Sequence, residues 1–168
     1  MNLANKVTLA RIIFIPLVLI LLFLGLYGLA ALIFAILCFS DAIDGYIARR
    51  YKQISNLGKV LDPLADKLLV LTVLIALTGL QKVNAIPVIL LTVREFIIHG
   101  IRVTQAQDQK VIHAIPIAKW KTTVQMLAIF MLILSLPLAE FTLWISVILA
   151  LVSSGVYLWQ NRTLHPLK

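Results

Sequence analysis

The stretch DAIDGYIARRYKQISNLGKVLDPLAD, residues 41–66, places four aspartates in a chain that is otherwise strongly apolar. Asp41 and Asp44 are three residues apart, and Asp62 and Asp66 are four apart, so each pair lies on one face of an α-helix. The polar residues between the pairs predict a loop. We therefore expect two neighbouring helices whose acidic faces meet at the same end.

Four carboxylates beside hydrocarbon cannot all stay ionised without cations among them, because desolvating an unpaired charge costs more free energy than packing returns. Oxygen ligands suit Mg²⁺, Mn²⁺ or Ca²⁺, and residues 41–66 contain no Cys or His that would favour Zn²⁺. Mg²⁺ is the expected ion, because it commonly combines a few carboxylates with water and substrate phosphates. Two such ions would clamp a diphosphate and stabilise both the attacking and the leaving oxygen.

The composition indicates a membrane protein. Of the 168 residues, 61% are hydrophobic and only 13% are charged, which departs strongly from soluble domains. The formal net charge is +8, but the basic residues are scattered among apolar runs and form no stripe, so we expect no nucleic-acid partner. Membrane lipids, anionic ones in particular, and a phosphorylated substrate are the expected partners.

Hydrophobic runs predict an all-α integral membrane protein that forms one domain over residues 1–168. A short interfacial amphipathic helix is expected over residues 1–11. Six transmembrane spans are expected over residues 12–27, 29–50, 59–80, 85–103, 122–136 and 140–160. Pro63 either occupies the first turn of the third span or kinks it. We expect no cleavable signal peptide, since the first apolar run lacks a small-residue cleavage site.

The distribution of Lys and Arg predicts the orientation. With six spans both termini share a side, and that side also receives the basic residues of 49–59 and 102–121. The opposite side receives only Lys82 and the acidic Glu140. Both termini and the aspartates are therefore expected on the cytoplasmic side. The expected location is a bacterial inner membrane.

The aspartates belong to a longer pattern. The spacing D-x2-D-G-x2-A-R-x8-G-x3-D-x3-D is satisfied in full from Asp41 to Asp66, and it resembles the signature of the CDP-alcohol phosphotransferase family. The opening NLANKVTLAR, the segment LGKVLDPLADKLL, the REF of residues 94–96 and the KWKTTVQ of residues 119–125 are similar to the phosphatidylglycerophosphate synthase branch of that family. These elements cover residues 1–130.

The resemblance implies a fold and a reaction. Members of the family are six-helix membrane enzymes, usually homodimers. The branch transfers a phosphatidyl group from CDP-diacylglycerol to sn-glycerol 3-phosphate and releases CMP, a step of glycerophospholipid biosynthesis. The resemblance also implies that Asp41, Asp44 and Asp62 hold the metals, with Asp66 beside them as a further ligand and the general base.

Two further groups of residues are expected to bind substrate. Contacts with the CDP donor are expected from Asn5, Thr8, Gly45, Ala48, Arg49, Gly58 and Lys59. Contacts with the acceptor phosphate are expected from Arg94, Arg102, Lys119, Lys121 and Thr122. Gly45 and Ala48 lack bulk on the acidic face, and Arg49 and Lys59 can bind phosphate that the metals leave unneutralised.

Each of these residues could instead have a purely structural role. The aspartates could form ion pairs with Arg49, Arg50 and Lys67. Arg94 could pair with Glu95, and Lys119 and Lys121 could be interfacial anchors. Asn5 and Thr8 could only cap or solvate the first helix.

Other functions also remain open. A small cation transporter clusters acids too, but near the membrane midplane and often on broken helices. A non-catalytic helical protein would not need the fixed eight-position pattern. Within the enzyme class, the acceptor could instead be inositol phosphate, serine or a second phosphatidylglycerol.

Overall fold

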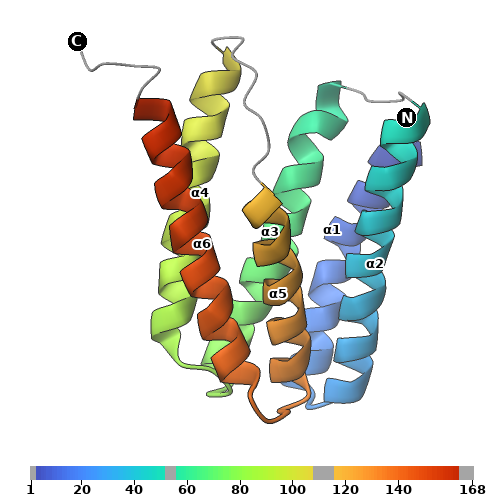
Figure 1. The fold of residues 1–168 in the computed structure, drawn as a ribbon. Helices are drawn as coiled ribbons and strands as arrows, with labels where there is room; N and C mark the ends of the chain where they lie inside the picture. The colour runs from blue at the N-terminus through green and yellow to red at the C-terminus, as the bar shows by residue number, and fades with distance from the viewer. Residues whose placement is uncertain (1–2, 52–55, 108–115, 163–168) are drawn as a thin grey trace. The chain divides into compact units, whose positions relative to one another are not determined.

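The computed structural model describes residues 3–51, 56–107 and 116–162, which form α-helices and no strand (Figure 1). In chain order these are α1 (Leu3–Phe23), α2 (Tyr27–Tyr51), α3 (Asn56–Gly79), α4 (Ala85–Gln107), α5 (Pro116–Ile133) and α6 (Ala139–Arg162). Side chains are described for residues 12–40, 67–101 and 120–159. Within the described residues, the expected all-α class is confirmed.

Three boundaries differ from the predictions. α1 is one continuous helix with Pro16 inside it, so residues 3–11 are helical as predicted but no break separates them from the first apolar run; their interfacial position stays a prediction. No Gly or Pro precedes Pro16 to interrupt the first turns. α5 begins at Pro116 instead of residue 122, because proline suits the first position of a helix. Pro63 lies inside α3 beyond its first turn, so the placement of Pro63 in the first turn of this helix is excluded.

The chain divides into two compact units, Met1–Val83 with Ile129–Pro137, and Asn84–Ala128 with Leu138–Lys168. In the first unit, α1 packs against both α2 and α3. Its buried side chains are apolar and include Ile15, Val18, Leu22, Ala31, Phe34, Leu69, Val73 and Leu77. The outer faces of the same helices expose Ile20 and Leu32, each by 55%, and such apolar faces require lipid or protein around them.

Helices α1, α3 and α5 end in the same backbone motif. Their last turns are closed by the N–H groups of Gly25 and Leu26 in α1, Gln81 and Lys82 in α3, and Ser135 and Leu136 in α5. In each pair the bonds run to carbonyls three and five residues back, which is the Schellman arrangement. It requires a positive φ, which is 74° at Gly25, 57° at Gln81 and 54° at Ser135, and only the glycine adopts it without strain.

Lys82, just after α3, contacts the end of α5 and the start of α2. Its Nζ donates to Ser135 Oγ at 2.7 Å and to the Ile133 carbonyl at 3.4 Å, and it lies 3.3 Å from the centroid of the Tyr27 ring. A cation is favourable beside helix C-terminal carbonyls and over an aromatic face. Partial burial lowers the pKa of Lys82 because it removes water from the ammonium, and these contacts offset that loss. The end of α3 is thereby attached to the end of α5 and the start of α2.

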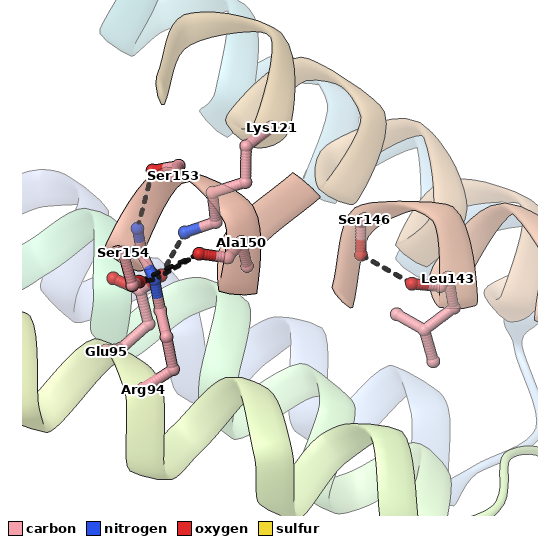
Figure 2. A network of polar contacts seen from close by, with 8 residues as sticks. All are labelled: Arg94, Glu95, Lys121, Leu143, Ser146, Ala150, Ser153 and Ser154. Carbon is pink, nitrogen blue, oxygen red and sulfur yellow. Dashed lines mark hydrogen bonds and ion pairs between the residues drawn. The ribbon is translucent and has the colours of Figure 1, made fainter. Parts of the chain in front are cut away.

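In the second unit, α4 packs against α6 through a buried arginine. Arg94, in the middle of α4, is only 8% exposed. Its Nε donates to Ser154 Oγ at 2.6 Å and to the Ala150 carbonyl at 3.1 Å, and its Nη2 donates to Ser153 Oγ at 3.0 Å (Figure 2). Small side chains on α6 allow the helices to approach closely enough for these bonds.

Among the described residues, one segment is long and apolar enough to cross a membrane, Ala139–Trp159 in α6. Shorter apolar segments occupy four other helices, namely Ile12–Phe23, Tyr27–Ser40, Lys67–Gly79 and Trp120–Ile133. One candidate span is therefore found in the described part of the chain, and the full set of six spans stays a prediction.

Replacing Lys82 tests the joint between the helix ends. Lys82→Met keeps an unbranched side chain that is one atom shorter and removes the charge, so the free energy of unfolding should fall by about 1–3 kcal/mol. Thermal unfolding in detergent measures the change. Tyr27→Phe keeps the ring and serves as the control, with no loss expected. Equal stability of Lys82→Met and the wild type would contradict the role of Lys82.

A second pair of variants tests the contact between α4 and α6. Ser154→Ala removes a hydroxyl that accepts from Arg94, so stability should fall by about 1–3 kcal/mol. Ser146→Ala is the matched control, because Ser146 is also buried in α6 but its hydroxyl donates to the Leu143 carbonyl within the same helix, at 2.7 Å. Thermal unfolding of both variants should show the larger loss for Ser154→Ala, and equal losses would contradict the interhelical role.

Candidate active site

The two aspartate pairs lie on continuous helical backbone. Asp41 and Asp44 fall in the C-terminal half of α2, and Asp62 and Asp66 fall in the N-terminal half of α3. Their spacings of three and four residues keep each pair on one face of its helix, as the sequence predicted. The four side chains lie outside the described residues, so the meeting of the two pairs stays a prediction.

The residues expected to bind the CDP donor also lie in helices. They are Asn5 and Thr8 in α1, Gly45, Ala48 and Arg49 in α2, and Gly58 and Lys59 in α3. Their side chains, too, are outside the described ranges. Because α1 packs against both α2 and α3, the three helices that carry the predicted donor and metal residues are neighbours in one unit.

The residues expected to bind the acceptor phosphate belong to the second unit. Arg94 and Arg102 lie on α4, and Lys119, Lys121 and Thr122 lie on α5. The side chains of Arg102 and Lys119 are outside the described ranges. Thr122 is exposed, whereas Lys121 is only 6% exposed, so these two neighbours face different sides of α5.

Arg94 and Lys121 meet at Glu95. Arg94 Nη1 donates to Glu95 Oε1 at 2.8 Å, and Lys121 Nζ donates to the same oxygen (Figure 2). Each of the three residues is more than nine-tenths buried. All three guanidinium nitrogens of Arg94 have partners on α4 or α6. Of the two roles considered for Arg94, an ion pair with Glu95 and binding of the acceptor, these contacts favour the ion pair. The ammonium of Lys121 carries three donors and can serve more than one acceptor.

Ser153 and Ser154 had no predicted role. A signal was present, since two adjacent hydroxyls in an apolar span are costly to bury unless they are hydrogen-bonded. Gln125 was also missed. It lies one turn beyond Lys121 on the same face of α5, is 3% exposed, and its Nε2 has no hydrogen-bond partner among the described residues. An unpaired buried amide nitrogen costs about 1–3 kcal/mol, so this donor is available to an oxygen of water or substrate.

The donor chemistry of the aspartate pairs fits a divalent metal. Carboxylate oxygens from two helices suit Mg²⁺ or Mn²⁺, which prefer oxygen ligands. In the described part of the chain, no three His, Cys, Asp or Glu side chains gather. Glu95 is bound by two cations, so its surroundings are those of an ion-pair partner and not of a metal ligand.

Comparison with known proteins places these features in a family. The chain matches the family CDP-alcohol phosphatidyltransferase over residues 1–152, a range that contains both aspartate pairs. A protein of Rickettsia typhi is 36% identical to it over 96% of this chain and 98% of its own length. A protein of Bacillus subtilis is 37% identical over 95% of each chain, and one of Pseudomonas fluorescens is 31% identical over 95% of this chain and 86% of its own.

These three relatives share one name, CDP-diacylglycerol–glycerol-3-phosphate 3-phosphatidyltransferase. The similarity extends beyond the residues 1–130 that the sequence motifs covered and includes most of α6. The chain therefore belongs to the CDP-alcohol phosphatidyltransferase family of enzymes.

Proposed function

We propose that this protein transfers a phosphatidyl group from CDP-diacylglycerol to sn-glycerol 3-phosphate, which gives phosphatidylglycerophosphate and CMP. The observation that carries the proposal is the shared name of relatives that match nearly the whole chain. The eight-position pattern from Asp41 to Asp66 supports the same chemistry. The reaction would serve glycerophospholipid biosynthesis.

The chemistry follows from the aspartates. We assign Asp41, Asp44 and Asp62 as the residues that would hold two divalent ions, with Mg²⁺ as the best fit, and such ions would supply positive charge to the diphosphate and to the departing CMP. Asp66, a further ligand beside them, takes the proton of the acceptor hydroxyl as that oxygen bonds to the lipid-linked phosphorus. The bond between this phosphorus and the oxygen of CMP breaks, and CMP leaves.

The remaining first-unit residues hold the donor. Gly45 and Ala48 leave room for the CDP portion beside α2, since neither carries a bulky side chain. Arg49 and Lys59 bind phosphate oxygens, and Gly58 lets the backbone of α3 approach the nucleotide. Asn5 and Thr8 line the edge of the donor site from α1.

The second unit supplies the charge for the acceptor. We assign Arg102, Lys119 and Lys121 as its phosphate ligands. Thr122 was expected to add a hydroxyl donor, but it faces a different side of α5 from Lys121, so we assign it no contact with the phosphate. We assign Arg94 no direct contact with the phosphate, because its guanidinium nitrogens are already bonded to α6 and to Glu95. It supports the acceptor site by holding Glu95.

We place the enzyme in a bacterial inner membrane as a homodimer of six-span chains, with its site on the cytoplasmic side. The skewed distribution of Lys and Arg supports this orientation. The exposed apolar faces of the helices support a surrounding of lipid and a second chain.

An acceptor panel tests the function. The purified protein is given CDP-diacylglycerol, Mg²⁺ and either glycerol 3-phosphate, inositol phosphate, serine or phosphatidylglycerol, and both CMP release and the lipid product are measured. Glycerol 3-phosphate should give phosphatidylglycerophosphate, and a reaction without acceptor sets the background. Turnover with another alcohol would contradict the acceptor alone, whereas ion flux without CMP release would contradict the enzyme.

Replacing the proposed base tests the mechanism. Asp66→Asn should lower kcat by a factor of about 10²–10⁴, because the acceptor hydroxyl loses the group that takes its proton. The KM for CDP-diacylglycerol should change little. Asp108→Asn is the control, because Asp108 has no proposed role in the site, and it should leave kcat unchanged. Full activity of Asp66→Asn would remove the assignment.

A further inference from the structure

Glu95 connects a fixed arginine to a lysine on a neighbouring helix. Arg94 is held by two serine hydroxyls and the Ala150 carbonyl of α6, and it donates to Glu95 Oε1. The same carboxylate oxygen accepts from Lys121 of α5. These contacts run from α6 through α4 to α5, and all of them lie within the second unit (Figure 2).

We propose that Glu95 is a positioning residue, which holds the Lys121 ammonium where it binds the phosphate of the acceptor. The inference rests on the proposed function and adds a residue to its acceptor site. A lysine side chain has several rotatable bonds, and it loses rotamer entropy when it binds a ligand in one geometry. The bond to Glu95 fixes Lys121 before the substrate arrives, so less of that entropy opposes binding.

The contacts of Arg94 restrict the rotation of the Glu95 carboxylate. A carboxylate on its own can rotate, but here Arg94 Nη1 fixes the oxygen that Lys121 uses. Arg94 in turn cannot follow Lys121, because its other nitrogens are bonded to α6. Lys121 therefore has a fixed partner on α4.

The charges of the three residues favour an anionic ligand. Arg94 and Lys121 carry two positive charges and Glu95 one negative charge, so the formal charge of the trio is +1. Each member is more than nine-tenths buried, where electrostatic interactions with a ligand are stronger than in water. A phosphate monoester carries the opposite charge, and the proposed acceptor is one.

Gln125 adds an independent sign of a ligand on this face of α5. It follows Lys121 by four residues, so both side chains leave the helix on the same side. Its buried Nε2 has no acceptor among the described residues. Lys121 and Gln125 thus offer two donors to an oxygen-rich group, which is the chemistry of a phosphate.

A double-mutant cycle tests the proposal. Glu95→Gln, Lys121→Met and the double variant are compared with the wild type for kcat and for the KM of each substrate. Glu95→Gln should raise the acceptor KM about tenfold and leave the donor KM unchanged, since only the acceptor phosphate uses Lys121. The double variant should have the same acceptor KM as Lys121→Met, because Glu95 acts through Lys121. Glu95→Asp, which keeps the charge on a shorter arm, should give an intermediate value.

Three results would overturn the proposal. A lower acceptor KM in Glu95→Gln would show that the carboxylate competes with the phosphate. An additive rise in the double variant would show that Glu95 does not work through Lys121. Equal rises in both KM values with a lower unfolding temperature would show a structural role alone. Where Glu95→Gln does not fold, the cycle is run with Glu95→Asp, and the same three results apply.

The acceptor panel separates this inference from the proposed function. If another phosphorylated alcohol proves to be the acceptor, the cycle is measured with it, and coupling between Glu95 and Lys121 would support the inference although the acceptor assignment failed. If glycerol 3-phosphate is the acceptor and no coupling is found, the inference fails while the function stands. An acceptor without phosphate would overturn the inference.

Discussion

A charge inside an apolar helix must find a partner, and this constraint explains the polar chemistry of the chain. Arg94 and Lys121 meet it with Glu95 and with the hydroxyls of α6. The two aspartate pairs cannot meet it among themselves, because all four groups carry the same sign. The opposite charges of Arg94, Lys121 and Glu95 stabilise the second unit. For the four aspartates, divalent ions are the proposed partners, and ion pairs with basic residues such as Arg49 are the alternative.

In the first unit, the contacts that connect the helix termini and the four aspartates lie at opposite ends of α2 and α3. α2 starts and α3 ends where Lys82 contacts Tyr27 and Ser135, and the helix termini there are closed by backbone motifs and one cation. The aspartates lie toward the other ends of the same two helices. A closure at one end would hold in place the two helices whose opposite ends carry the proposed metal ligands, which is how functional residues are commonly supported.

Local patterns in the sequence predicted the parts of the structure that depend on local physics. The apolar runs predicted helices, and the spacing of the aspartates predicted a shared face on each helix. Helix boundaries were less predictable: nothing between residues 1–11 and the first span breaks α1, and Pro116 starts α5 early. The partners of Arg94 could not be predicted, because Ala150, Ser153 and Ser154 are more than fifty residues away and only tertiary packing brings them together. The meeting of the aspartate pairs depends on tertiary packing in the same way.

Metal binding by the aspartates is the central claim, and electron paramagnetic resonance of Mn²⁺ tests it most directly. Titration of the purified protein should remove free Mn²⁺ from solution with two ions bound per chain, and the bound signal should be broadened by coupling between neighbouring ions. A variant with Asp41→Asn and Asp62→Asn should leave the ions free. Equal binding by this variant and the wild type, or no binding by either, would contradict the claim.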